Sequence, residues 1–314
     1  MTRRECLQLV LAAAAPAGSE RHFRFSVCNE TFESTSFEEQ CRLAREIGYE
    51  GIEMMAGTLA DNPISIPPVR RKELRRVIGD QGLSFVGLHN LLTVPQGMRA
   101  SARDARVRRR TWDFVSGLVD LCSDLGSNGI LVFGSGKQRD AEPGDATSDA
   151  LARFRDGLRS VAPHALEAGV TILIEPLAPR LSNLLNRLDE TVELVRQIES
   201  PAVRTMFDVH NTAGETLPAP ALIAKYIPFI RHVHLNEMDG RRPGTGSYDF
   251  RALFAALARY SYSGWLSLEV FDFQPSGKVV ASEALRYLRS QIPAGFAQRN
   301  LQPGQPASTV FLDW

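Results

Sequence analysis

The stretch of sequence that decides the fold runs from residue 232 to residue 246 and reads HVHLNEMDGRRPGTG. Its first part predicts a β-strand, because Val233 and Leu235 are apolar and alternate along the chain. Side chains two positions apart lie on one face of a strand, so His232 and His234 share a face. The second part is rich in glycine and predicts a loop, with Glu237 at the junction. Two imidazoles and a carboxylate are therefore expected where a strand turns into a loop.

Three other segments have the same layout as this stretch. Each is a short apolar strand that carries an acid at or near its C-terminal end. They read ILIEP at 172–176, TMFDVH at 205–210 and LSLEV at 266–270. The acids are Glu175, Asp208 and Glu269, and their repetition is the main sequence observation that bears on function.

Strand-like and helix-like segments alternate along the chain from Phe23 onward. The expected strands are 23–29, 51–55, 84–90, 129–134, 170–175, 203–208, 231–235 and 265–270, and the expected helices are 36–47, 67–80, 102–125, 147–168, 189–198, 220–226, 249–260 and 279–292. Eight such units within residues 21–295 predict a single (β/α)8 TIM barrel of the α/β class. A doubly wound sheet is the alternative, but no GxGxxG motif follows the first strand.

Functional groups of such a barrel lie at the C-terminal ends of its strands. Glu175, Asp208, His234 and Glu269 are expected there, one from each of four successive strands. An oxygen-rich set with one nitrogen ligand suits a divalent ion, with Mn²⁺ as the first choice and Mg²⁺, Co²⁺ or Zn²⁺ as alternatives. A cation would also relieve the repulsion between buried carboxylates. A salt-bridged barrel residue is the alternative reading of any one acid, but it explains four together poorly.

The composition limits the partners of the chain. Lys+Arg and Asp+Glu both number 36, so the formal net charge is zero and no general attraction to nucleic acid or an anionic membrane is expected. The expected partner is a small sugar or hydroxy-ketone, and a homo-oligomer stays open. The arginine cluster at 103–110 predicts a solvated helix face, with an oligomer contact as the alternative. The four cysteines show no metal-binding spacing, and most are expected to be small buried side chains.

The two ends of the chain are set apart from the barrel. Residues 1–20 carry two arginines, an apolar run from Leu9 to Ala15 and a small-residue region, which predicts a twin-arginine export signal and a periplasmic location. A frayed helix on a cytoplasmic protein is the alternative. The run is shorter than the ~20 residues of a membrane span, so none is expected. Residues 296–314 predict a short irregular C-terminal tail.

The strand signatures together resemble the xylose isomerase-like TIM barrel superfamily, in its sugar phosphate isomerase/epimerase branch. That branch includes the ketose 3-epimerases and hydroxypyruvate isomerase. The matching signatures are IEP at 174–176, FD at 207–208, HVH at 232–234, PGTG at 243–246 and SLE at 267–269. The resemblance covers about residues 23–292, and its HxHxxE…PGxG element is more specific than the short strand signatures.

The resemblance implies a reaction and roles for these residues. Glu175, Asp208, His234 and Glu269 would hold the metal, and Glu175 and Glu269 would also be the acid/base pair on opposite faces of an open-chain sugar. The implied reaction is isomerisation or epimerisation by proton transfer next to a carbonyl, through an enediolate.

Two departures from the branch concern substrate binding. The histidine after the Asp208 strand comes at two residues, as His210, rather than at three. Glycine stands at 240, where an arginine is common, and Arg241 follows it. The expected substrate contacts are His89, which ends the third strand, together with Asn183, His210, Glu237 and Arg241. For His89 and Asn183 a structural role is the alternative.

Other sequence features leave alternatives open. Glu53 shares an inward strand face with Gly51, so contact with substrate and a structural role are both open, and His232 is expected behind or below the site. The segment GSGK at 134–137 lacks phosphate-loop spacing, so no nucleotide site is expected. The alternative functions are a lyase on 3-keto glycosides, a sugar-binding barrel without turnover, and a metal-dependent endonuclease. Balanced charge and a single HxH element count against the nuclease.

Overall fold

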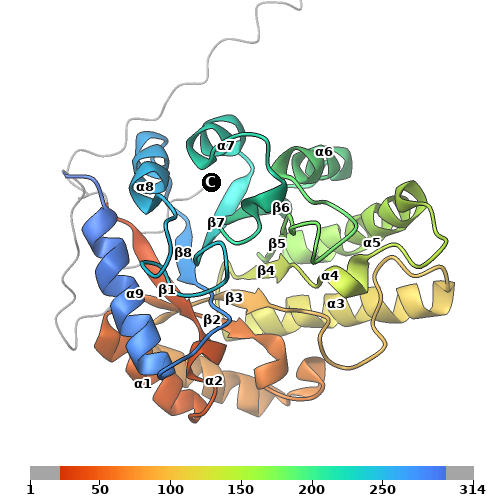
Figure 1. Ribbon diagram of the computed structural model, residues 1–314. Helices are drawn as coiled ribbons and strands as arrows, with labels where there is room; N and C mark the ends of the chain where they lie inside the picture. The colour runs from red at the N-terminus through yellow and green to blue at the C-terminus, as the bar shows by residue number, and fades with distance from the viewer. Residues whose placement is uncertain (1–21, 295–314) are drawn as a thin grey trace, which may run out of the picture.

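The computed structural model describes residues 22–294 and contains a closed barrel of parallel strands ringed by helices (Figure 1). The strands pair in chain order, and the first pairs with the last. Their bounds are β1 Arg24–Cys28, β2 Gly51–Met55, β3 Ser84–His89, β4 Ile130–Phe133, β5 Thr171–Ile174, β6 Val203–Asp208, β7 Ile230–Leu235 and β8 Trp265–Leu268. The predicted (β/α)8 barrel is confirmed.

The helices lie outside the barrel and follow the predicted order. Their bounds are α1 Phe37–Ile47, α2 Pro68–Asp80, α3 Ala105–Leu125, α4 Gly136–Arg139, α5 Thr147–Glu167, α6 Leu188–Ile198, α7 Ala219–Tyr226, α8 Phe250–Arg259 and α9 Gly277–Gln291. Four short 3-10 helices also occur in the described chain, at Asn29–Phe32, Ala56–Thr58, Pro63–Ser65 and Thr212–Gly214. The short helix α4 was not predicted.

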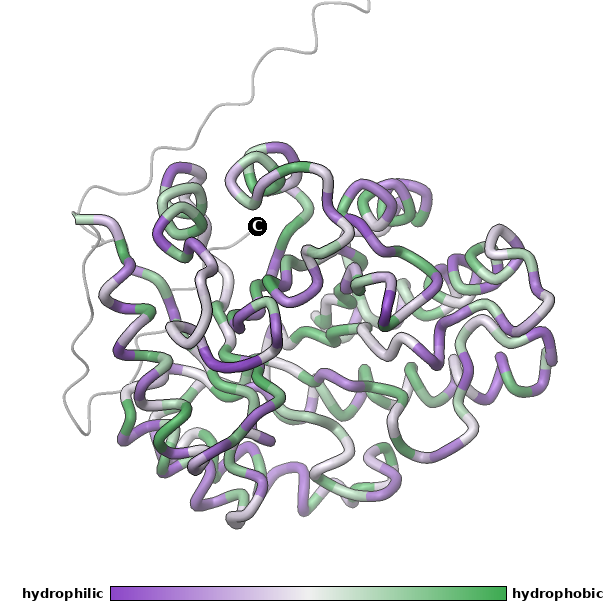
Figure 2. Tube along the Cα trace, in the orientation of Figure 1, coloured by the Kyte–Doolittle hydropathy of each residue, from purple (hydrophilic) through white to green (hydrophobic). Residues whose placement is uncertain are grey.

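Local signals explain where most helices begin and end. Ser36 accepts a hydrogen bond from the Glu39 amide at the start of α1, and Gly48 ends that helix with φ of 106°. Helix α3 begins three residues later than predicted, because the Asp104 side chain accepts from the amides of its first turn. Figure 2 shows polar and apolar residues mixed along the helices, as expected for elements that cover a core on one side only.

The barrel interior is built in two layers. The lower layer is apolar and contains Val86, Ile130, Val132, Leu173 and Met206, with Trp265 packed against it. Two residues further along β5 and β6 the same inward face carries Glu175 and Asp208. The strands thus change from apolar to ionisable side chains as they approach the mouth of the barrel.

Several predictions from the sequence concern regions outside the site. Cys28, Cys41 and Cys122 are buried and unbridged, as expected. Across residues 22–294, no helix combines the length and the apolar character that crossing a membrane requires. The export signal at 1–20 and the tail at 296–314 lie outside the described residues.

Candidate active site

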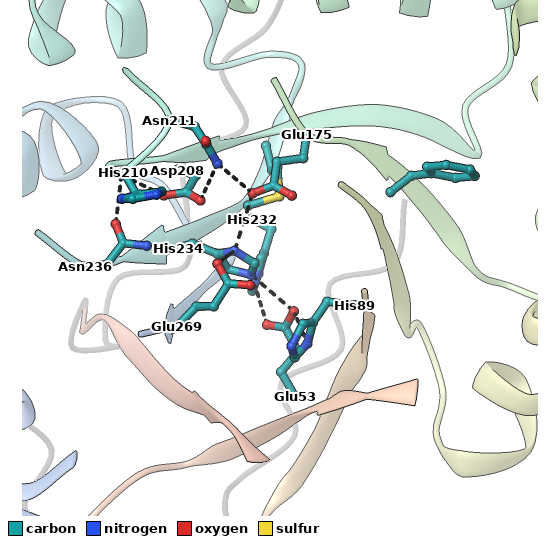
Figure 3. A network of polar contacts seen from close by, with 12 residues as sticks. Glu53, His89, Glu175, Asp208, His210, Asn211, His232, His234, Asn236 and Glu269 are labelled. Atoms are coloured by element: carbon teal, nitrogen blue, oxygen red, sulfur yellow. Dashed lines mark hydrogen bonds and ion pairs between the residues drawn. The ribbon is translucent and has the colours of Figure 1, made fainter. Parts of the chain in front are cut away.

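Four side chains converge at the mouth of the barrel from the ends of four neighbouring strands. Each offers one ligand-type atom, and these atoms all lie within 4.8 Å of one another. Glu175 and Glu269 follow β5 and β8 directly, and Asp208 and His234 lie at or near the ends of β6 and β7. All four are at least nine-tenths buried. The structure therefore brings together the four residues that the sequence marked as metal ligands (Figure 3).

The contacts inside this cluster are close. His234 Nδ1 lies 3.0 Å from Glu269 Oε2 and 3.8 Å from Glu175 Oε1. The Asn211 side-chain amide donates to Glu175 Oε1 at 3.2 Å and to Asp208 Oδ2 at 2.8 Å. Asn211 stands three residues after Asp208, which is the spacing at which the resemblance led us to expect a histidine. No role for Asn211 was predicted from the sequence. Its position three residues after Asp208 is the feature that could have revealed it.

The electrostatics of the cluster favour a cation. Burial raises the pKa of Glu175 well above its ordinary 4.5, and the charges of Glu269 and Asp208 raise it further. Burial and the Glu269 charge also raise the pKa of Asp208. His234 Nδ1 makes no hydrogen bond of good geometry although it is buried. Three carboxylates and an imidazole nitrogen that faces them fit a divalent cation with oxygen and nitrogen ligands.

A second polar group lies beside this cluster and is centred on Glu53. Its carboxylate lies 2.8 Å from His232 Nε2, 3.1 Å from His234 Nε2 and 3.3 Å from His89 Nδ1. His89 Nε2 in turn lies 2.9 Å from Glu30 Oε1. Burial would raise the pKa of Glu53, but the attraction and hydrogen bonds of His232 and His234 hold it well below its ordinary value. The sequence left the role of Glu53 open, and the structure gives it three histidine partners.

The predicted substrate contacts fall in different places. His89 is buried between Glu30 and Glu53, so both its nitrogens face carboxylates of this chain. The Glu237 carboxylate accepts from the amides of Gly244 and Tyr248 and so holds its own loop. In this structure both side chains contact groups of the chain itself.

Asn183 and Arg241 are also held by contacts within the chain. Asn183 joins the loop after β5 to the loop after α4, and Arg241 pairs within its own loop. The Asn183 side chain exchanges two hydrogen bonds with the Ala141 backbone, at 2.9 and 3.1 Å. Arg241 pairs with Asp239 at 2.7 Å, and both side chains are half exposed. Neither side chain is among the polar contacts of the four-residue cluster in the described chain.

His210 lies next to the cluster, as the sequence predicted for a substrate contact. Its backbone amide donates to Asp208 Oδ1 and to Asn236 Oδ1, both at 2.8 Å. Its ring packs edge-on against Phe271, with centroids 5.1 Å apart, and contacts the Arg180 guanidinium. Arg180 was not predicted, and it brings a positive charge to His210 from the loop after β5.

Arg139 is a further residue that the sequence did not reveal. It is fully buried and donates to the backbone carbonyls of Phe133 at 3.0 Å and Glu175 at 2.7 Å, and more weakly to those of Leu184 and Leu185. Burial lowers its pKa to about 10. Arg139 thus ties the ends of β4 and β5 together below Glu175.

A close approach makes glycine necessary at one position of the site. A Cβ atom on Gly134 would lie 2.2 Å from Glu175 Oε2. Any larger residue there would displace the Glu175 carboxylate. The glycine that precedes the unpredicted helix α4 is therefore part of the site's geometry.

The family model described as xylose isomerase-like TIM barrel matches residues 41–291, which is most of the chain. The chain belongs to the xylose isomerase-like TIM barrel family. The family predicted from the strand signatures is thus confirmed.

Curated relatives within this family are named for sugar chemistry. Fructoselysine 3-epimerase of Shigella flexneri is 22% identical over 268 residues, which cover 82% of this chain and 93% of the relative. L-ribulose 3-epimerase of Mesorhizobium japonicum is 30% identical over 231 residues, covering 73% of each chain. With such epimerases among its relatives, this member of the xylose isomerase-like family is an isomerase-class enzyme.

Solved structures agree on the fold. A D-psicose 3-epimerase crystallised in the presence of D-fructose matches with a TM-score of 0.73 at 19% identity, covering 86% of this chain and 99% of the other. A 3-keto-D-glucoside 4-epimerase from E. coli matches with a TM-score of 0.74 at 18% identity, covering 85% and 99%. At these identities the likeness supports the xylose isomerase-like barrel alone.

Proposed function

We propose that this protein is a divalent-metal-dependent epimerase or isomerase that moves a proton at the carbon next to a carbonyl of a sugar. The observation that carries the proposal is the convergence of Glu175, Asp208, His234 and Glu269 within 4.8 Å at the barrel mouth. The names of the relatives, which include L-ribulose 3-epimerase and ketose 3-epimerase, support a ketose as the substrate.

The four clustered residues would hold the cation, with Mn²⁺ as the first candidate. When bound, a divalent cation supplies Lewis-acid stabilisation of negative charge that develops on the sugar oxygens during proton removal. The fit rests on the donor set and on the His234 nitrogen that lacks a hydrogen bond. Asp208 and His234 are assigned to binding alone, because the acid/base work falls to the glutamates.

Glu175 and Glu269 are the proposed acid/base pair. They extend from β5 and β8, which are separated around the barrel by β6 and β7. A sugar placed between them would present opposite faces to the two carboxylates. One glutamate would remove the α proton to give an enediolate, and the other would return a proton on the opposite face, which inverts the carbon. Burial of both groups excludes water and strengthens their effect on the substrate.

Solvent exchange tests the proposal directly. The metal-free protein would be incubated in D₂O with a panel of ketopentoses and ketohexoses, with and without added Mn²⁺. We expect deuterium at the α carbon together with an epimerised or isomerised product, and only with the metal. Exchange that is independent of metal, or a protein that binds metal and ketose without exchange, would contradict the proposal. The second result would instead favour a sugar-binding barrel.

A lyase acting on 3-keto glycosides is a second candidate, and the rim of the mouth favours it. Four large apolar side chains on the loops after β5 to β8 are 40–55% exposed, namely Leu181, Leu217, Met238 and Phe271. Exposed apolar groups around a polar site suit a substrate that carries an apolar substituent. A 3-keto glucoside with a nitrophenyl aglycone separates the two reactions: release of nitrophenol supports the lyase, whereas deuterium exchange with an intact glycoside supports the epimerase.

A further inference from the structure

We propose that Glu53 is a positioning residue that fixes the ring orientation and tautomer of His234, so that His234 presents Nδ1 to the carboxylate cluster. The inference rests on the proposed function, because that function makes the cluster the metal site. Glu53 comes from β2 and contacts His234 Nε2, whereas the cluster is contacted by Nδ1 of the same ring, which comes from β7.

The contacts of the two His234 nitrogens define the two sides of the ring. Nε2 lies 3.1 Å from Glu53 Oε1, and Nδ1 lies 3.0 Å from Glu269 Oε2. The ring therefore stands between a carboxylate outside the cluster and the cluster itself, as Figure 3 shows. A half-turn of the ring about its Cβ–Cγ bond would put the carbons Cε1 and Cδ2 where Nε2 and Nδ1 now lie. Both the contact with Glu53 and the nitrogen that faces the cluster would then be lost.

The chemistry of the pair then selects the tautomer. An ionised carboxylate only accepts hydrogen bonds, so the imidazole nitrogen that faces it must carry the proton. With the proton on Nε2, the lone pair of neutral His234 lies on Nδ1, where a metal could use it. Carboxylates behind metal-binding histidines play this part in many metal sites.

Further contacts hold Glu53 itself in place. Glu53 is fully buried, its second oxygen Oε2 lies 2.8 Å from His232 Nε2, and His89 Nδ1 lies 3.3 Å from Oε1. His232 precedes His234 by two residues on β7, so the strand's period-two spacing places both rings against one carboxylate. This arrangement gives the HxH spacing a physical purpose: the first histidine anchors the carboxylate that orients the second.

A competing explanation would make Glu53 a metal ligand. Atoms of Cys28, Glu53 and His234 also lie within 4.8 Å of one another. Both Glu53 oxygens, however, already face imidazole nitrogens at hydrogen-bond distance. Removal of Cys28 separates the explanations, because a positioning role for Glu53 does not involve the thiol.

Nitrogen NMR of the histidines in the wild-type chain tests the inference without any substitution in the tested protein. Spectra would be recorded for metal-free protein and for protein with added Mg²⁺ or Zn²⁺, with the His234 signals assigned by their loss in a His234→Asn variant. We expect a proton on Nε2 in both states and an unprotonated Nδ1 once metal is bound. An Nε2 without a proton, in either state, would overturn the inference.

Metal affinity supplies the second test. Calorimetric titration with Mn²⁺ is expected to show about 10–100-fold weaker binding for Glu53→Gln, because the glutamine amide cannot accept at both positions. Glu50→Gln is the matched control: it is a buried carboxylate just before β2, at the opposite end of the barrel, and its Mn²⁺ affinity is expected to stay within about twofold of wild type. Cys28→Ala is expected to bind Mn²⁺ like the wild type.

The outcomes separate the inference from the proposed function. Wild-type affinity in a folded Glu53→Gln variant overturns the inference and leaves the function standing. A loss of affinity in Cys28→Ala as large as that in Glu53→Gln would overturn it too, in favour of Glu53 as a ligand. If Asp208→Asn binds Mn²⁺ as tightly as the wild type, the cluster is not the metal site and the proposed function fails. If Glu53→Gln does not fold, the protonation of Nε2 in the wild type decides.

Discussion

Two groups of buried carboxylates lie side by side at the barrel mouth, and their charges are compensated in different ways. Glu53 faces three imidazoles. Burial would raise its pKa, but the contacts with His232 and His234 hold that pKa well below the ordinary value. Glu175 and Asp208 lie near Glu269, and the repulsion among these acids together with burial raises their pKa. His234 is the member that both groups share.

This difference indicates which of the two carboxylate groups needs a bound ligand to balance its charge. The chain's own imidazoles satisfy Glu53 when the barrel folds, so that group is complete without a ligand. The three acids of the second group have one imidazole and the Asn211 amide between them. Without a cation their repulsion favours keeping protons, as the raised pKa of Glu175 and of Asp208 indicates, and a bound cation would balance them in the ionised form. The predictions below test whether the two groups differ in this way.

The largest effect is expected from the proposed acid/base pair. Glu269→Gln removes a proton-transfer group, and we expect turnover to fall by about 10²–10⁴-fold or below detection while much of the sugar affinity remains. Isotope exchange and sugar binding would be measured on the same preparation. Glu193→Gln, on the exposed side of α6, is the control and should leave turnover unchanged. Full activity in Glu269→Gln would remove this residue from the mechanism.

The next effect concerns the support beneath Glu175. Arg139→Met removes four hydrogen bonds to buried carbonyls. The carbonyls of Phe133, Leu184 and Leu185 keep a second donor, so we expect a loss of about 1–3 kcal/mol in the free energy of unfolding. Urea denaturation measures it. Arg159→Met is the control, since Arg159 makes one exposed hydrogen bond to Gln197 and its loss should cost less than about 0.5 kcal/mol. Equal stability of the two variants would show that Arg139 does not support the site.

Removing the metal tests whether the group of Glu175, Asp208 and Glu269 depends on a bound cation for its stability. At a Mn²⁺ concentration of about 100 times the Kd, binding adds about 2.7 kcal/mol, which raises Tm by roughly 5 °C for a chain of this size. Chelation should reverse the shift. Asp208→Asn should lose most of it, because that variant removes a ligand from the uncompensated group. A shift of the same size in Asp208→Asn would place the ion elsewhere.

The smallest effect is the pH dependence of the metal-free protein. The raised pKa of Glu175 means that the folded state keeps a proton that the unfolded state releases near pH 4.5, so stability falls as pH rises above 4.5. The raised pKa of His234 acts in the same direction above pH 6.5, as its attraction to Glu269 and Glu53 is lost. Glu53 acts oppositely, since its lowered pKa contributes stability that is lost on acidification.

Urea midpoints measured in chelator between pH 5 and 9 check this dependence. Each released proton contributes up to about 1.4 kcal/mol per pH unit to the fall in stability. Glu175→Gln should flatten the slope, because it removes one of the groups that titrate. A stability that rises with pH in the metal-free wild type would show that the acids of the second group are already compensated.

The sequence predicted the barrel and the four clustered residues because both follow from period-two spacing at strand ends. Glu175, Asp208, His234 and Glu269 each end a short apolar strand, and parallel strands deliver their C-terminal residues to one edge. The boundaries of the strands were within a few residues for the same reason. These properties are local in the chain and need no knowledge of loop paths.

The remaining site residues depend on contacts that the sequence does not encode locally. Arg139 acts through carbonyls of residues up to 46 positions away, and Glu53 meets His234 across 181 positions. Asn183, Glu237 and Arg241 were placed near substrate because they stand in loops at the mouth. In the structure Glu237 and Arg241 contact groups of their own loop, and Asn183 contacts the Ala141 backbone in the loop after α4.

The closed order of the strands has a consequence for when the site can form. The four clustered residues come from β5 to β8, whereas the carboxylate that orients His234 comes from β2, and the ring closes only when β8 pairs with β1. A nascent chain that has not yet reached Glu269 lacks both the closing strand and one of the four donors. Binding of an ion by all four ligands therefore requires that the final strand has been synthesised. It also requires that the two halves of the chain have packed together.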